Sequence, residues 1–182
     1  GLEVCREVFL TLDPEVYFEA HAQDGERLKR GEPIVTLNGR AEALLSGERV
    51  ALNFIQKLSG IATLARRFAD RVRGTGTKIV DTRKTTPGFR FLEKYAVTVG
   101  GCGNHRFGLF DGVLIKENHI AMAGGIRRAV QAVRAKVAHT VKIEVETRNL
   151  EEVQEALSAG ADIIMLDNME TALMRKAVSE IR

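Results

Sequence analysis

In the second half of the chain, apolar strand-like segments alternate with amphipathic helix-like segments, and few folds accommodate this order. The strand-like segments are residues 110–117, 141–147 and 162–168, and the helix-like segments between them are residues 125–137 and 149–159. Apolar runs of this kind are typical of parallel strands that are buried on both faces. Strand–helix repeats with right-handed crossovers predict an α/β fold, either an α/β barrel or an open, doubly wound sheet.

A fourth strand-like run, Lys78–Asp81, precedes these segments and ends in cations and hydroxyl groups. The cluster contains Thr82, Arg83, Lys84, Thr85 and Thr86, and Pro87 and Gly88 follow as a turn signal. An arginine fork matches a carboxylate with two parallel hydrogen bonds, whereas lysine is a point charge suited to phosphate. The stretch therefore predicts a binding site for a small, strongly anionic ligand, with a solvated basic loop as the alternative.

Ionisable residues stand at or near the carboxyl ends of all four predicted strands. They are Arg83, Lys84, Lys116, Glu146 and Asp167. Parallel α/β barrels and sheets bind their ligands at this edge. A glycine-rich segment, residues 100–108, adds His105 and Arg106, and its glycines would let the backbone approach a ligand closely. We expect the cationic residues of both groups to face one anionic molecule.

The strand at residues 141–147 carries its charges on one face. A period of two places Lys142, Glu144 and Glu146 on one side and Ile143 and Val145 on the other. In a barrel the two apolar side chains would pack outward against helices, and the three charges would point inward. Buried charges are costly unless they are paired or bind a ligand, so an internal lattice of salt bridges is the alternative to a functional site.

Two carboxylates of this edge, Glu146 and Asp167, are candidate ligands for Mg²⁺, an ion that takes further ligands from water and substrate phosphates. General acid–base catalysis is their alternative role. A zinc site of Cys102, His105 and His119 is also conceivable, but its spacing matches no familiar zinc finger. An anionic ligand beside metal-bound phosphates indicates transfer from a phosphorylated donor.

The first half of the chain begins with a small β-rich segment. Its predicted strands are residues 16–21, 33–37 and 41–46, with hairpin-type turns at residues 24–25 and 38–39. The order of this segment is similar to the half-barrel of lipoyl and biotinyl carrier domains. A carrier needs an exposed lysine between two hydrophobic residues at a hairpin tip, and Lys29 stands instead between Leu28 and Arg30.

A helical pattern follows over residues 47–73, with one continuous apolar face, Ser46 as a candidate cap and Gly60 as a possible break. A second, shorter helix is predicted at residues 91–99. Arg49 stands in the first turn of the long helix, where the positive end of the helix dipole disfavours a cation. Either Glu48 compensates for it or the guanidinium has a partner elsewhere.

Composition narrows the classes of partner. With 27 basic and 24 acidic residues the net charge is only +3, aromatic residues are 5% and tryptophan is absent. Nucleic acid is therefore not an expected partner. No apolar run approaches the length of a membrane span. Two distant cysteines, Cys5 and Cys102, fit a reducing compartment better than a disulfide framework, so we expect a cytoplasmic protein.

Ordered motifs along the chain resemble those of the quinolinate phosphoribosyltransferase family. They are GERVALN from Gly47, LSGIAT from Leu58, DTRKTTPG from Asp81, EKY from Glu93, NHR from Asn104, VLIKENHI from Val113, KIEVE from Lys142 and LDN from Leu166. The resemblance implies part of an α/β sandwich domain at residues 1–46, a connecting helical segment at residues 47–75, and an α/β barrel of the type II phosphoribosyltransferase kind at residues 76–182. It also implies Mg²⁺-dependent conversion of quinolinate and phosphoribosyl pyrophosphate to nicotinate mononucleotide, pyrophosphate and carbon dioxide, in de novo NAD synthesis.

The resemblance also implies a role for each candidate residue. The carboxylates of quinolinate would be held by Arg83, His105, Arg106 and Lys116, and by Arg49 from a neighbouring subunit of a homodimer or higher homo-oligomer. Lys84, Glu146 and Asp167 would face the phosphoribosyl donor and act in catalysis, the two carboxylates through Mg²⁺ and the ribose hydroxyls.

One departure from the family pattern and two other hypotheses leave alternatives open. Family chains are longer at both ends, so we expect the barrel's last strands and the donor's phosphate loops to be missing from these 182 residues. A relative that acts on nicotinate or another acid, such as the molybdenum-transport-associated homologues, is the second hypothesis. A carrier module modified at Lys29 is the third.

Overall fold

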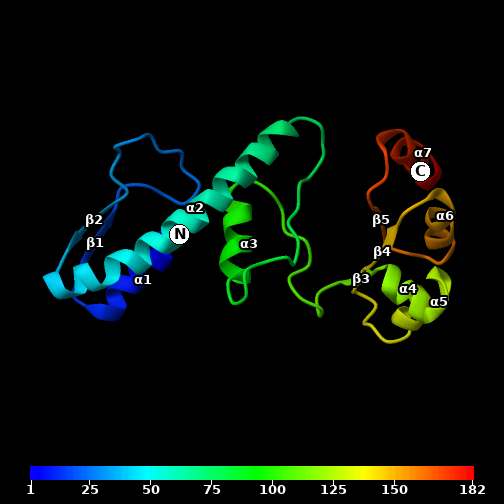
Figure 1. Ribbon diagram of the computed structural model, residues 1–182, viewed down its shortest axis with the longest axis horizontal. Helices are drawn as coiled ribbons and strands as arrows, with labels where there is room; N and C mark the ends of the chain where they lie inside the picture. The colour runs from blue at the N-terminus through cyan, green and yellow to red at the C-terminus, as the bar shows by residue number, and fades with distance from the viewer. The chain divides into compact units, whose positions relative to one another are not determined.

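The computed structural model describes all 182 residues. They form two compact units, residues Gly1–His105 and Arg106–Arg182. Figure 1 shows the elements of each unit along the chain. None of the helices combines the length and the apolar composition needed to cross a membrane.

The first unit packs helices around a two-stranded sheet. Its elements are α1 (Leu2–Leu12), β1 (Tyr17–Ala20), β2 (Val35–Asn38), α2 (Ala41–Arg71) and α3 (Arg90–Val99). The strands are antiparallel, with Tyr17 opposite Asn38. Buried Cys5, Phe9, Val16 and Ala51 form the core between α1, α2 and the sheet. At the α1–α2 contact a Cβ on Gly47 would lie 2.8 Å from the Phe9 ring, so only glycine lets the helices approach this closely.

The strand predicted at residues 41–46 is wrong, because these residues are the first turns of α2. Alanine, glutamate and leucine, which favour helices, fill the segment, and Ala43, Gly47 and Ala51 are buried at the spacing of four that marks one helix face. The predicted cap at Ser46 is also wrong, since the N-cap is Arg40. Gly60 does not interrupt the helix and costs only its lower helix propensity, about 1 kcal/mol.

The strand predicted at Lys78–Asp81 is reduced to a single parallel bridge between Val80 and Gly103. Local hydrogen bonds turn the chain immediately afterwards: Lys84 N–H donates to Thr82 Oγ1 and Thr85 N–H donates to the Arg83 carbonyl. Such bonds compete with strand pairing. The helix predicted at residues 91–99 is confirmed as α3.

The second unit confirms the predicted strand–helix repeats. It contains β3 (Val113–Ile115), α4 (Glu117–Ala123), α5 (Ile126–Arg134), β4 (Ile143–Thr147), α6 (Leu150–Ser158), β5 (Ile163–Leu166) and α7 (Thr171–Ile181). The strands form a parallel sheet in the order β3-β4-β5. Helix α4 was not predicted. Asn149, whose side chain accepts from Glu152 N–H, caps the start of α6.

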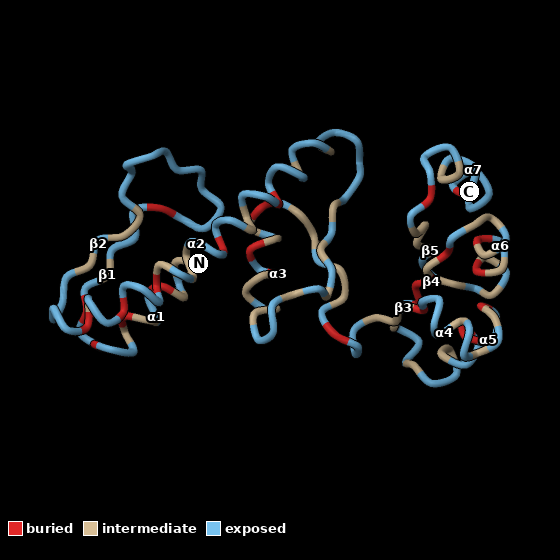
Figure 2. Tube along the Cα trace, in the orientation of Figure 1, coloured by how far each residue is buried: buried red, intermediate tan, exposed pale blue.

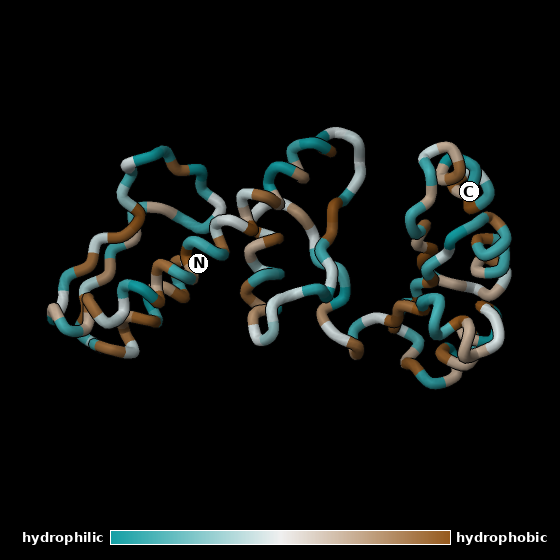
Figure 3. The backbone as a smooth tube through the Cα atoms, viewed as in Figure 1, coloured by the Kyte–Doolittle hydropathy of each residue, from teal (hydrophilic) through white to brown (hydrophobic).

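The core of the second unit lies between β4 and the helices. Ile143 and Val145 are fully buried and pack with Ile126, Val130 and Ala156 of α5 and α6, as the period of two predicts. Figure 2 shows buried positions along β4 and α6, and Figure 3 shows β3 as a hydrophobic segment. On the opposite face Glu144 is buried, but Lys142 precedes the strand and is exposed. The prediction of three inward charges is therefore wrong at Lys142.

Candidate active site

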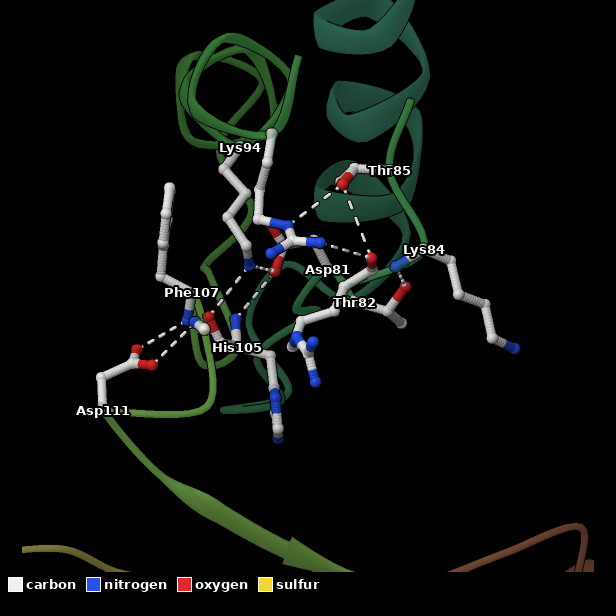
Figure 4. Close-up of polar contacts among 11 residues, drawn as sticks. Asp81, Thr82, Lys84, Thr85, Lys94, His105, Phe107 and Asp111 are labelled. Carbon is white, nitrogen blue, oxygen red and sulfur yellow. Dashed lines mark hydrogen bonds and ion pairs between the residues drawn. The ribbon is translucent and has the colours of Figure 1, made fainter. Parts of the chain in front are cut away.

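A buried ion pair stands at the end of the Lys78–Asp81 run. Lys94 Nζ, from α3, lies 2.5 Å from Asp81 Oδ1, and the two side chains are 3% and 10% exposed. Figure 4 shows the pair at the centre of a network of polar contacts. Removing either partner would leave a buried charge unpaired, which costs roughly 3 to 5 kcal/mol. The pair therefore fixes α3 against the end of this run.

The same pair holds the backbone of His105. Asp81 Oδ1 accepts from His105 N–H at 2.8 Å, and Lys94 Nζ donates to the His105 carbonyl at 3.0 Å. With its amide oriented to satisfy both ends, the Asn104 side chain donates to Asp81 Oδ2 at 2.8 Å and to the Lys94 carbonyl at 3.1 Å. The glycine-rich segment is thus tied to the basic cluster through its backbone.

Arg83 carries the clearest sign of a missing ligand. Its Nε atom is buried and has no hydrogen-bond partner, and an unsatisfied buried donor costs about 1–3 kcal/mol. The backbone around it is well held, because Arg90 donates from Nη2 to the Arg83 carbonyl at 3.4 Å and from Nε to Thr85 Oγ1 at 3.1 Å. A carboxylate is the natural acceptor for such a fork. Lys84 is exposed, and in Figure 4 its side chain extends away from the ion pair.

The turn after the basic cluster is fixed by contacts from α2 and α3. Glu93 accepts from Thr86 N–H at 3.1 Å and pairs with Lys57 Nζ at 2.9 Å, and Lys57 also donates to Thr86 Oγ1. Phe89, next along the turn, stacks on Phe54 of α2. Burial alone would raise the pKa of Glu93, but hydrogen bonds from Thr86 and Lys57 outweigh it and hold the pKa below its ordinary value.

Arg106 opens the second unit and is held beside a tight loop. Its Nη1 donates to the Gly112 carbonyl at 2.9 Å. Asp111 closes the loop by accepting from Phe107 N–H at 2.6 Å and from Gly108 N–H at 2.8 Å. These backbone hydrogen bonds hold the pKa of Asp111 below its ordinary value. The hydrogen bond to Gly112 therefore anchors the Arg106 side chain to this loop.

Predicted residues gather at the carboxyl edge of the three-stranded sheet. Lys116 follows β3 and its Nζ lies 3.4 Å from Glu146 Oε2 in β4. Asp167 follows β5, and its N–H donates to the Thr147 carbonyl at 2.8 Å, which aligns it with the end of β4. Asn168 Nδ2 donates to Asp167 Oδ2 at 3.0 Å. The structure thus brings Lys116, Glu146 and Asp167 to one edge, as predicted.

Asn168 is the one non-glycine residue with a positive φ, at 50°. The left-handed conformation is tolerated by asparagine better than by most side chains. Such strained residues concentrate at functional sites.

The two carboxylates suit a magnesium ion that relies on other ligands as well. Glu146 and Asp167 stand at the ends of neighbouring strands, and the ion pair of Glu146 and the hydrogen bond of Asp167 each use one carboxylate oxygen. No group of three or more His, Cys, Asp or Glu side chains is close enough to hold a metal ion unaided. Mg²⁺ is commonly bound by one or two carboxylates together with waters and substrate phosphates, so the donor set fits. The zinc alternative at Cys102, His105 and His119 lacks such a cluster.

One predicted ligand, Arg49, stands outside this network, and two residues inside the network had no predicted role. Arg49 lies exposed on α2 without a hydrogen bond or ion pair. Asp81 and Lys94 were part of quoted motifs but had no assigned role. The only signal for them was a lysine inside a short helix and an aspartate before a basic cluster, and neither names its partner.

Both halves of the chain match models of one protein family. A model described as the N-terminal domain of quinolinate phosphoribosyl transferase matches residues 1–59, and one described as its C-terminal domain matches residues 61–182. The chain is 49% identical over 182 residues to a probable nicotinate-nucleotide pyrophosphorylase (carboxylating) of Synechocystis, covering 100% of this chain and 62% of that protein. It is 53% identical over 168 residues to the Bacillus subtilis protein of the same description, covering 92% of this chain and 58% of the relative.

Solved structures show the same fold. NadC from Streptococcus pyogenes matches 100% of this chain and 64% of its own with a TM-score of 0.95 and 44% identity. Nicotinate-nucleotide pyrophosphorylase from Ehrlichia chaffeensis matches 100% and 66% with a TM-score of 0.94, also at 44% identity. The chain spans less than two thirds of the length of the relatives it matches, and its α/β fold corresponds to part of a barrel.

Proposed function

This chain belongs to the quinolinate phosphoribosyltransferase family, and we propose that the full-length protein transfers the phosphoribosyl group of phosphoribosyl pyrophosphate to quinolinate in NAD biosynthesis. The products are nicotinate mononucleotide, pyrophosphate and carbon dioxide. The observation that carries the proposal is the buried, unpartnered Nε of Arg83, in a segment tied to His105. A carboxylate of quinolinate would supply the missing acceptor.

Recognition of quinolinate depends on cations matched to two carboxylates. The proposed ligand set is Arg83, His105, Arg106 and Lys116, and Arg49 would join it from a neighbouring subunit. The exposed, unpaired guanidinium of Arg49 supports this last assignment, because nothing in its own chain engages it. Arginine favours planar, bidentate contact with carboxylates.

The phosphoribosyl donor would meet Lys84, Glu146 and Asp167. As pyrophosphate leaves, positive charge develops on the ribose carbon, and carboxylates held at the strand ends stabilise it electrostatically. Lys84 would offset the negative charge of the donor's phosphates. When bound by Glu146 and Asp167, Mg²⁺ would neutralise phosphate charge and help to orient the leaving pyrophosphate.

The bond changes require no covalent enzyme intermediate. The pyridine nitrogen of quinolinate forms the bond to the ribose carbon as the carbon–pyrophosphate bond breaks. The resulting pyridinium withdraws electrons from the ring, so the bond to the adjacent carboxylate breaks with its electron pair left on the ring carbon. A proton then replaces the released carbon dioxide.

Three further assignments belong to the same proposal. The protein would act as a homodimer or higher homo-oligomer, because Arg49 has no partner within its chain. It would work in the cytoplasm, where its free Cys5 and Cys102 thiols remain reduced. Its domains would be divided near residues 46 and 76.

The experiment that tests the proposal is product formation by the full-length protein from phosphoribosyl pyrophosphate and Mg²⁺, with quinolinate and nicotinate supplied separately. Product from quinolinate alone supports the proposal. A site with several cations rejects a mono-acid, because the unmatched cations would be left unpaired. Product from nicotinate alone would contradict the proposal and favour a relative that acts on another acid.

A further inference from the structure

We infer that the buried pair of Asp81 and Lys94 is a positioning device for the quinolinate site and not simply a stabilising contact. The inference rests on the function proposed above. Neither residue reaches the ligand in that proposal. Both act through the segments that carry Arg83 and His105.

Burial makes the charges of this pair costly. The Lys94 and Asp81 side chains are 3% and 10% exposed, so both charges are removed from water. An apolar pair of similar volume often stabilises a protein as well as, or better than, a buried ion pair. Stability alone therefore gives little reason for charges at these two positions.

Both charges hold the backbone of the neighbouring segment. The backbone of His105 is gripped on both sides, because its N–H donates to Asp81 Oδ1 at 2.8 Å and its carbonyl accepts from Lys94 Nζ at 3.0 Å. An apolar pair could satisfy neither group. The Asn104 amide completes the network by donating to Asp81 Oδ2.

Few other backbone contacts hold these two segments together. Residues 79–81 and 103–105 are joined as strands by one isolated bridge, with Gly103 N–H donating to the Ile79 carbonyl and Asp81 N–H to the Gly103 carbonyl. So short a ladder leaves the ends of both segments free to shift. The ion pair fixes the ends of both segments. Arg83 lies two residues after Asp81, and His105 is the end of the other segment.

The pair thus sets the distance between Arg83 and His105, two of the residues proposed to bind quinolinate. Misplacing such groups by about 1 Å costs on the order of a hundredfold in a well-oriented site. We expect the neutral double variant Asp81→Asn/Lys94→Met to fold, because no charge is left unpaired. It should nevertheless bind quinolinate about tenfold or more weakly.

The test is calorimetric titration of full-length wild type and the double variant with quinolinate, together with urea unfolding and the KM for phosphoribosyl pyrophosphate. The matched control is Asp13→Asn/Arg40→Met, since Asp13 is also buried and pairs with Arg40 at 3.2 Å in the same unit. The control should lower the urea midpoint without changing quinolinate affinity. The Asp81→Asn/Lys94→Met variant should lose affinity for quinolinate, while its KM for phosphoribosyl pyrophosphate should equal that of wild type.

A second variant keeps the inference testable if the double variant does not fold. Lys94→Arg retains the buried charge but replaces a compact ammonium with a larger, planar guanidinium, which must displace the Asp81 carboxylate or the His105 backbone to fit the buried space. It should fold and still weaken quinolinate binding. Unchanged quinolinate affinity in a folded Lys94→Arg or double variant overturns the inference. Wild-type protein that does not bind quinolinate would contradict the proposed function itself.

Discussion

At the scale of single residues, Arg83 shows a conflict between stability and binding. Its buried Nε has no hydrogen-bond acceptor in the chain. An unsatisfied buried donor destabilises a protein by about 1–3 kcal/mol, and Arg83→Met removes that donor. We expect this variant to unfold at a higher urea concentration than wild type. We also expect roughly tenfold to hundredfold weaker quinolinate binding, the equivalent of a lost charged hydrogen bond.

The two measurements for Arg83→Met are urea unfolding without ligand and calorimetric titration with quinolinate. Arg67→Met, which removes an exposed guanidinium of α2 that makes no hydrogen bond, is the control and should change neither quantity. Lower stability together with unchanged affinity would show that Arg83 is a structural residue.

Asn168 provides a second prediction at this scale. Its φ of 50° is strained for most side chains, so Asn168→Ala should lower the free energy of unfolding by roughly 1 kcal/mol. Asn168→Gly should relieve the strain but lose the hydrogen bond to Asp167 Oδ2. Urea unfolding of both variants tests this, and an alanine variant as stable as the glycine variant would contradict it.

The charged residues of the candidate site could be predicted from the sequence, but the residues that pair with them could not. The types and positions of Lys116, Glu146 and Asp167 at strand ends were sufficient to predict their gathering. Lys94 could not be assigned, because its partner Asp81 stands 13 residues away and the contact depends on how α3 folds back. One sequence alone does not indicate that α3 packs back against the segment that carries Asp81.

At the scale of elements, Glu93 links α3 to the turn at Thr86 and should make stability depend on pH. Its pKa in the folded protein lies below the unfolded value. Its contribution is therefore complete above the unfolded pKa, near 4.3, and is lost as pH falls through the lower folded pKa. The difference in free energy of unfolding between wild type and Glu93→Gln should be largest near pH 7 and shrink in acid.

Urea unfolding at a series of pH values from 7 to 3 measures this difference. Glu48→Gln, which changes an exposed glutamate of α2 that makes no hydrogen bond, is the control and should run parallel to wild type. A Glu93→Gln difference that does not vary with pH would remove Glu93 from the contacts that stabilise this turn.

Elements with a strong period were predicted well and those decided by tertiary contacts were not. The repeats in the second unit follow from buried strands and one-sided helices such as α6. Residues 41–46 were assigned to a strand because a turn signal precedes them, yet they complete a helix face that packs on α1. Lys78–Asp81 has strand-like residues but only one pairing contact.

At the scale of the whole molecule, the chain belongs to the quinolinate phosphoribosyltransferase family. The proposed transfer of a phosphoribosyl group to quinolinate depends on this membership. The two family models together match residues 1–59 and 61–182. The chain spans 62% of the length of the Synechocystis relative. Activity must therefore be tested on the full-length protein.

The most direct test is release of labelled carbon dioxide from quinolinate labelled in the carboxylate next to the ring nitrogen. The assay contains the full-length protein, with phosphoribosyl pyrophosphate and Mg²⁺ present or omitted. The proposed reaction should yield carbon dioxide and nicotinate mononucleotide in equal amounts, only when the donor is present, and chelation of Mg²⁺ should abolish both products. Binding of quinolinate without any donor-dependent release of carbon dioxide would contradict it.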